Sequence, residues 1–360
     1  MRINRYGQVG VFLGGAVVLQ LAAAAAGKGF ILTQLTMSAY YTLVVVGMSL
    51  LMGYAGQISL GHAGFFAVGG YTSAVLTTLD LAPHRAQPLV AVSERLGLLL
   101  ARADPYGGEL LVVQPLVACI LAMALAIALA VLVGIPVLKL KGHYLAMATL
   151  GVGTIVYSIA LGTQWLGAAD GIAAVPPFPL PFGASVGGRV AGRVVNYYVA
   201  VALLGAAMLL ALNLVQSRVG RALRAIHGAE DAASAMGVDT ASLKLGTFVL
   251  SAALAAVAGV FLTHFNGGIG PSEASVMKSV KYMAIVAVGG MGSLWGTLGM
   301  SLALNFLSLR GYFGVFDDVV FGLILVGIML FAPDGLLALE PRRALVRLRA
   351  RLGAAREERR

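Results

Sequence analysis

The chain has 360 residues, of which 59% are hydrophobic and 11% are charged, and its mean hydropathy is +0.90. A soluble domain is about one quarter charged, so this composition excludes an ordinary soluble protein and indicates an integral membrane protein. The net charge of +10 is gathered in short loops and a C-terminal tail, which argues against a nucleic-acid surface, and the single cysteine, Cys119, excludes an intrachain disulfide.

Nine apolar segments are candidate membrane spans, because a helix needs about 20 residues to cross the hydrocarbon core. They cover residues 9–26, 30–52, 60–79, 111–137, 143–163, 195–215, 245–265, 278–309 and 315–333. The first segment follows Arg2 and Arg5, as a secretory signal peptide would. We expect it to be retained, because it runs directly into further spans.

The distribution of basic residues predicts which ends of the spans face the cytoplasm. Lys139, Lys141, the loop 216–244 and a tail with eight arginines mark that side, and loops 80–110 and 164–194 then lie outside. Nine simple crossings would place the tail outside, against the positive-inside rule. We therefore predict that 278–309 is a broken, re-entrant pair that begins and ends outside.

The predicted fold is thus an all-α polytopic membrane protein with about eight full transmembrane helices and one broken helix pair. Its transmembrane permease domain would cover residues 1–340, including a cytoplasmic coupling loop at 217–244, and a basic cytoplasmic tail would cover 341–360. The tail suits a topology signal, with contact to anionic lipid as a supplementary role.

Two glycine-rich segments, 53–70 and 289–299, interrupt spans in different halves of the chain. Such paired segments are typical of translocation pathways, whereas small residues spaced by four also allow close helix packing, and both can hold. For His62, a hydrogen bond to a neighbouring helix is the main alternative to a place on the pathway. The candidate pathway residues are Gln57, Ser59, His62, Gly64, Tyr71, Thr72, Gly289, Gly290 and Gly292.

The segment Ser217–Lys244 has the pattern of two short helices separated by Gly228. Glu230 and Asp231 suit the start of the second helix, and Gly237 suits its end. Its small side chains predict a hairpin that docks in a partner's groove, with an interfacial helix on membrane lipid as the alternative.

Several motifs together resemble a known family. The hairpin is similar to the coupling loop of ATP-binding-cassette importer permeases, and "GYAGQISLGHAGFFAVGGYTSA" resembles the signature of branched-chain amino-acid permeases. The segments 138–156 and 167–172, with "AIVAVGGMGSLWGTLGM" and "FAPDGL", resemble LivM-type subunits. The residues that this resemblance implies for ATPase coupling are Arg221, Glu230, Asp231, Ala232, Ala233 and Gly237.

The resemblance implies a multi-pass permease of the bacterial inner membrane that imports branched-chain amino acids. Its partners would be a LivH-like permease, two ATPase subunits that bind ATP and Mg²⁺, and a periplasmic solute-binding protein; the chain itself would hold no cofactor or metal and catalyse no reaction. The sequence contains no G-x-x-x-x-G-K-[ST] motif, in agreement with this division of labour.

Other functions stay open from the residues alone. The same machinery could import urea, short amides or aromatic acids. An ion-coupled secondary transporter would carry ionisable residues inside its spans, and we expect Glu273, Lys278, Lys281 and Asp317 to lie at span ends or in loops instead. A channel does not explain the hairpin, and an intramembrane enzyme would need a catalytic or metal cluster that the sequence does not suggest.

Overall fold

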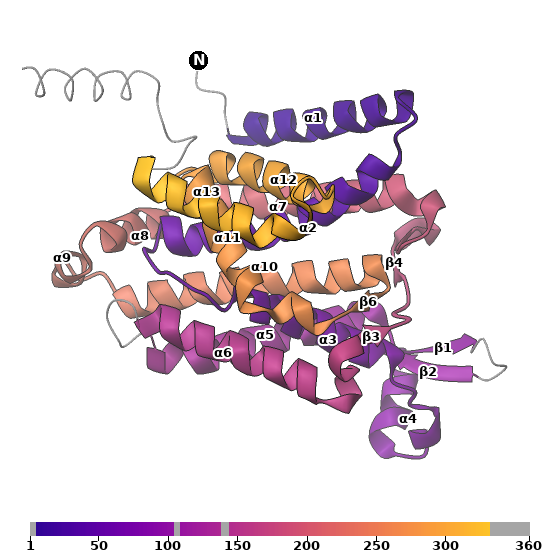
Figure 1. Ribbon diagram of the computed structural model, residues 1–360. Helices are drawn as coiled ribbons and strands as arrows, with labels where there is room; N and C mark the ends of the chain where they lie inside the picture. Colours follow the sequence, from indigo (N-terminus) through magenta and orange to yellow (C-terminus); the bar gives the residue numbers. More distant parts are fainter. Residues whose placement is uncertain (1–4, 104–108, 138–143, 332–360) are drawn as a thin grey trace, which may run out of the picture.

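The computed structural model describes residues 5–103, 109–137 and 144–331. In this part of the chain the long helices lie side by side, with a helical hairpin at one end and loops with short strands at the other (Figure 1). We call these the hairpin end and the loop end. The predicted basic tail and the "FAPDGL" motif lie outside the described residues, apart from Phe331.

The predicted set of helices is confirmed, including the interruption in the eighth segment. Six of the described helices are long and apolar enough to span a membrane by themselves. The α-helices are α1 Arg5–Ala25, α2 Phe30–Gly53, α3 His62–Thr78, α4 Pro88–Arg95, α5 Pro115–Val137, α6 Tyr144–Gly162, α7 Arg193–Gln216, α8 Arg218–Gly228, α9 Glu230–Ala235, α10 Thr240–Asn266, α11 Val276–Gly289, α12 Leu294–Leu309 and α13 Asp317–Phe331.

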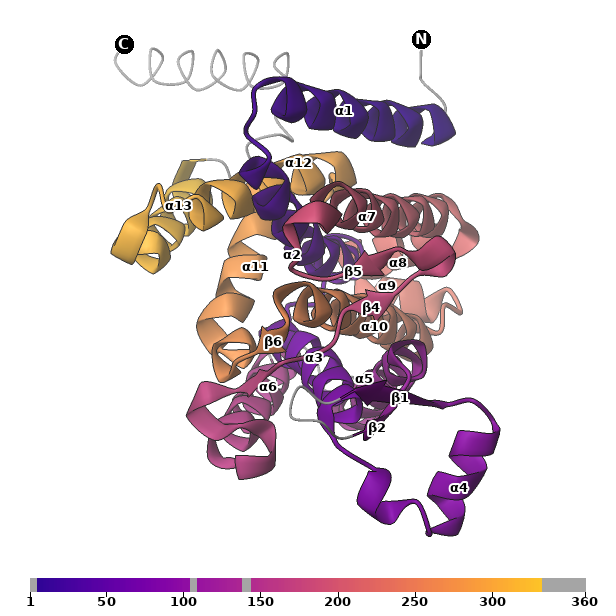
Figure 2. The ribbon, with the colours of Figure 1, turned by 90° about the vertical axis from the view of Figure 1, so that its right-hand side faces the viewer.

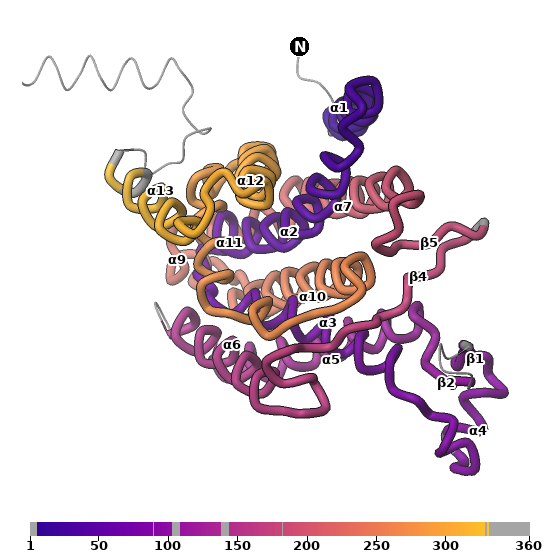
Figure 3. Tube along the Cα trace, turned by 45° about the vertical axis from the view of Figure 1, so that its right-hand side comes forward, coloured from indigo at the N-terminus to yellow at the C-terminus, as the bar shows by residue number. Residues whose placement is uncertain are grey.

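The central element is α2. Every residue from Ser38 to Met52 is buried, because α7, α10 and α12 pack around the helix (Figure 3). A helix that is apolar on all sides belongs in the core of a bundle. In contrast, α1 and α13 lie at the periphery of the bundle (Figure 2).

The segment 278–309 is a broken pair, α11 and α12, joined by the turn Gly290–Ser293. Gly290 has a φ of +92°, a conformation that L side chains rarely adopt. The turn lies against Gly53 at the hairpin end of α2. From there α12 returns to the loop end, where Cζ of Arg310 lies 4.6 Å from the centroid of the Phe30 ring. This arrangement confirms the predicted break, and α13 then begins at the loop end.

The predicted span 111–137 begins too early. Residues Glu109–Val113 form strand β2, which pairs antiparallel with β1, Leu99–Ala103, and α5 starts only at Pro115. Proline suits the first turn of a helix, where its missing N–H is not needed.

Two smaller strand pairs order the remaining loops at this end. They are β3 Ile172–Ala173 with β6 Gly268–Ile269, and β4 Phe178–Pro179 with β5 Ser185–Val186. A short 3-10 turn, η6 at Pro271–Ala274, then leads into α11.

Candidate functional site

The hairpin α8–α9 has the local structure that its sequence predicts. Helix α8 ends at Gly228, and α9 begins with Glu230 and Asp231, whose charges suit a helix N-terminus. Gly237 follows α9 with a φ of +82°, which ends the helix. The Asp239 carboxylate then accepts a hydrogen bond from the N–H of Ser242, 3.1 Å away, and caps α10.

The hairpin presents small and polar side chains to its surroundings. Arg221, Asp231, Ala232 and Gly237 are exposed, and Met236 at the end of α9 is 84% exposed. Glu230 is half-buried. Five of the six predicted coupling positions are therefore accessible to a partner, Glu230 only in part.

Ala233 differs from the prediction. Its side chain is only 5% exposed and packs into the protein's own core with Leu223 and Ile226. One stripe of α9 packs against the bundle, as in other amphipathic helices. Because Ala233 lies on that stripe, its side chain faces away from a partner's groove. Ala232 and Ala235 lie on the exposed side of α9.

Glu230 ties the hairpin to the bundle. Its carboxylate forms an ion pair with the Lys244 ammonium of α10, and Lys244 is only 8% exposed. A buried ammonium needs a partner, so this pair fixes α9 against the start of α10.

The segment between α2 and α3 connects the hairpin to the turn between α11 and α12. Gly56 has a φ of +66° and lies against the hairpin, since a Cβ on it would be 3.1 Å from Nδ1 of His227. Next to it, the Tyr54 hydroxyl donates to the carbonyl oxygen of Gly292 at 3.1 Å. A Cβ on Gly53 would overlap the backbone of Met291. We call these contacts the Tyr54 junction.

Tyr54 lies just beyond the last residue of α2. Burial raises the pKa of its phenol, and the positive charge of Arg224 on α8 partly opposes that rise. The hydroxyl therefore stays protonated at neutral pH and can donate to Gly292.

The structure places His62 between helices rather than beside an open route. The side chain is fully buried, with Nδ1 2.9 Å from Oγ of Ser59 and Nε2 2.6 Å from Oγ of Ser251 on α10. Both ring nitrogens thus have partners, as the helix-linking interpretation expects. Gly64 lies close to α6, where an added Cβ would be 3.1 Å from Cα of Gly153.

The other candidate pathway residues are dispersed. Gln57 is 6% exposed, and its Oε1 has no hydrogen-bond partner among the described residues. Tyr71 and Thr72 line an apolar cavity of about 530 Å³ between α3, α5 and α6. Gly289, Gly290 and Gly292 lie at the turn after α11. The two glycine-rich segments therefore meet at the Tyr54 junction, but the nine residues do not form one site.

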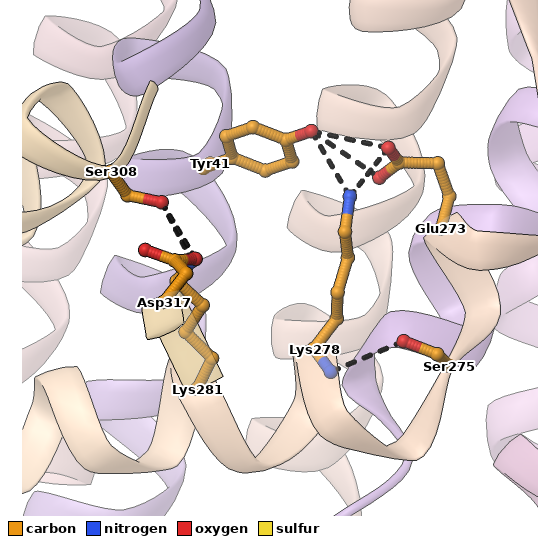
Figure 4. A network of polar contacts seen from close by, with 7 residues as sticks. All are labelled: Tyr41, Glu273, Ser275, Lys278, Lys281, Ser308 and Asp317. Carbon is orange, nitrogen blue, oxygen red and sulfur yellow. Dashed lines mark hydrogen bonds and ion pairs between the residues drawn. The ribbon is translucent and has the colours of Figure 1, made fainter. Parts of the chain in front are cut away.

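A polar cluster that sequence reasoning missed lies beside α2 (Figure 4). The Tyr41 hydroxyl is 3.2 Å from both Oε1 of Glu273 and Nζ of Lys278, and the two charged groups also pair with each other. The Glu273 side chain is 17% exposed and that of Lys278 is 27% exposed. Glu273 lies in the turn η6, Lys278 near the start of α11 and Asp317 at the start of α13, so the expectation that these charges belong to loops or span ends is confirmed, although their side chains are mostly buried.

The second half of the cluster joins three helices at the loop end. Lys281 on α11 pairs with Asp317 on α13 and donates to Oγ of Ser308 on α12 at 2.8 Å. Ser308 donates in turn to Asp317 at 2.9 Å. A signal was present in the sequence, since Lys278 and Lys281 are three residues apart and share one helix face.

Comparison with known proteins agrees with these features. The family described as branched-chain amino acid transport system, permease component, matches residues 30–332. The high-affinity branched-chain amino acid transport system permease protein LivM of Salmonella typhimurium is 30% identical over 322 residues, which cover 84% of this chain and 68% of LivM. LivH of Escherichia coli and BraD of Pseudomonas aeruginosa, permease proteins described in the same words, are each 26% identical over 314 residues; these cover 84% of this chain, 92% of LivH and 93% of BraD.

No solved structure matches the chain. The family match nevertheless extends over most of it, from the start of α2 to the end of the described residues. The chain belongs to the family of permease components of branched-chain amino acid transport systems.

Proposed function

We propose that this chain is the membrane-spanning permease subunit of an ATP-driven importer of branched-chain amino acids. The observation that carries the proposal is the family match over residues 30–332, together with the similarity to LivM. The accessible hairpin α8–α9 supports this proposal, because an ATP-driven permease needs a surface to which its ATPase subunits can bind.

The proposed partners follow from this division of labour. A LivH-like permease completes the transmembrane pathway, two ATPase subunits bind ATP with Mg²⁺, and a periplasmic binding protein delivers the solute. The hairpin end and the tail 341–360 would face the cytoplasm of a bacterial inner membrane, because basic residues gather there. The ATPases would dock on the exposed side of the hairpin, around Ala232 and Met236.

The Tyr54 junction supports a mechanism for coupling. Closure of the ATPase subunits around ATP would move α8 and α9 as a unit, because the Glu230–Lys244 pair and the capped helix ends make the hairpin rigid. Gly56 lies against His227 of that hairpin, and Tyr54 is bonded to Gly292. The movement would therefore be transmitted to the turn between α11 and α12. It would change the positions of these two short helices relative to α2.

Reconstitution tests the proposed substrate class. The permease would be placed in proteoliposomes with its partner permease, the ATPases and the binding protein, and ATP hydrolysis would be measured with leucine, isoleucine, valine, urea, a short amide and an aromatic acid. We expect the three branched-chain amino acids to stimulate hydrolysis most strongly. Stimulation by urea or the amide with no response to leucine would contradict the proposal.

A further inference from the structure

A polar cavity of about 320 Å³ lies between α2, α11, α12 and the start of α13. Its lining includes Tyr41, Lys278, Lys281, Tyr282, Asn305 and Asp317. This volume is at the lower end of the ~300–1,000 Å³ typical of small-molecule sites, which suits a ligand as small as an amino acid.

The cavity reaches deep into the bundle. Tyr41 is the twelfth of the 24 residues of α2, so it lies about 16 Å along the helix from its start at a rise of ~1.5 Å per residue. The Lys278 ammonium reaches that depth, because it bonds to the Tyr41 hydroxyl. Ionisable groups at such a depth mark solute or ion routes in membrane proteins. A buried ion pair contributes little to the net free energy of unfolding. Stability alone therefore does not explain why charged side chains lie at this depth.

Two buried polar atoms at this cavity have no partner among the residues that the structure describes. One is the hydroxyl of Tyr282, a residue that is only 2% exposed, and the other is Oδ1 of Asp317. Buried polar atoms are nearly always hydrogen-bonded, so an unpartnered donor and an unpartnered carboxylate oxygen beside the same cavity indicate a ligand.

The charges around the cavity form two ion pairs (Figure 4). Lys278 on α11 pairs with Glu273, and Lys281, three residues further along the same helix, pairs with Asp317 at the start of α13. An ammonium group carries three donors, so that of Lys278 can also hold a carboxylate, and the unpartnered Oδ1 of Asp317 suits an ammonium group. Met277, Leu309 and the ring of Tyr282 add apolar surface for an aliphatic side chain.

We propose that this cavity is a binding site for a zwitterionic α-amino acid on its way through the permease. The carboxylate is held by the Lys278 ammonium and the Tyr282 hydroxyl, and the ammonium is held by Asp317. The inference rests on the proposed function and narrows it, because a site with both charges selects an amino acid over urea or an amide.

Cysteine protection in the complete importer tests the site. Ser272 is exposed and lines the cavity, so Ser272→Cys in a Cys119→Ser background gives one reactive thiol beside it. The rate of modification by a small methanethiosulfonate would be measured with leucine, with 4-methylpentanoate, which lacks the amine, and with 3-methylbutylamine, which lacks the carboxylate. We expect leucine to slow modification several-fold and neither analogue to do so at the same concentration.

Two variants assign the contacts, and a third is the control. Tyr282→Phe and Asp317→Asn should each raise the leucine concentration for half-protection about tenfold, as expected when one hydrogen bond to a charged group is lost. Tyr40→Phe also removes a buried hydroxyl without a described partner, but Tyr40 packs against Phe261 and Phe265 instead. It should leave protection unchanged.

Leucine uptake by the same proteoliposomes separates failure of the site from failure of the proposed function. If the importer accumulates leucine but leucine never slows modification, the site is wrong and the function stands. Equal protection by the two analogues would overturn the zwitterionic site. A Ser272→Cys thiol that reacts neither at rest nor during ATP turnover would also overturn it, because a transported solute must be able to enter the cavity. An importer that accumulates another solute and not leucine would instead overturn the proposed function.

Discussion

The hydroxyl of Tyr54 donates a hydrogen bond to the carbonyl oxygen of Gly292, 3.1 Å away, and so joins the end of α2 to the turn between α11 and α12. These residues are far apart in the chain and belong to the two glycine-rich segments that interrupt its spans. The same stretch contacts the hairpin through Gly56 and His227. One short segment therefore lies between the surface proposed for the ATPases and the broken helix pair beside the polar cavity.

Removing this hydrogen bond should weaken coupling more than stability. In Tyr54→Phe we expect a loss of about 1 kcal/mol in the free energy of unfolding, typical of one hydrogen bond, and fewer leucine molecules transported per ATP hydrolysed. The measurement is uptake and phosphate release in the same proteoliposomes. Tyr198→Phe is the matched control, since its hydroxyl bonds to Gln20 of α1 at 3.2 Å, away from the junction. Equal transport per ATP in both variants would contradict a coupling role for Tyr54.

The junction also predicts which glycines tolerate a methyl group. In Gly53→Ala the new Cβ would overlap the carbonyl of Met291, so we expect a destabilisation of roughly 1–3 kcal/mol, as for other overpacked sites. In Gly292→Ala nothing lies within 4 Å of the new Cβ, so stability should hardly change. Thermal unfolding in detergent measures both, and equal midpoints would show that close approach at Gly53 does not matter.

The pair between Glu230 and Lys244 should contribute to the stability of the hairpin. Glu230→Gln leaves a mostly buried ammonium without its anionic partner, which should cost roughly 1–3 kcal/mol and loosen α9. Lys244→Met combined with Glu230→Gln removes both charges and should recover much of that loss. Limited proteolysis of the hairpin and thermal unfolding would measure the difference. A double variant that is as unstable as the sum of the single variants would contradict the pairing.

Neighbouring alanines of α9 should separate docking from folding. Ala232 is exposed, so Ala232→Leu should weaken binding of the ATPase subunits while the permease stays as stable as before. Ala233 is buried, so Ala233→Leu should lower the stability of the permease itself by about 1–3 kcal/mol. Co-purification of the ATPases and unfolding of the isolated permease give the two readouts. If Ala232→Leu binds the ATPases normally, the proposed docking surface is wrong.

Sequence reasoning predicted the helices and the hairpin well, because each depends on local signals. Hydropathy located the spans, Gly290 marked the break, and Gly228, Glu230 and Gly237 set the bounds of α9. Residues 111–113 were misassigned to a span, since an apolar strand next to an apolar helix has no local boundary apart from Pro115.

The site was less predictable, because it depends on contacts between distant segments. Ala233 and Ala232 look alike in sequence, and only tertiary packing makes one buried and the other exposed. Glu273 lies in the short turn η6 and Asp317 at the start of α13, and the burial of both side chains depends on how these elements pack near α11. His62 similarly acquires its second partner, Ser251, from a helix far along the chain.

An ion-coupled secondary transporter is the main alternative to an ATP-driven importer, so the energy source decides between the two. Uptake of labelled leucine should be measured in proteoliposomes that contain the complete importer and its binding protein, either with ATP and no ion gradient or with a proton or sodium gradient and no ATP. We expect accumulation only with ATP. Accumulation driven by either gradient without ATP would contradict that expectation.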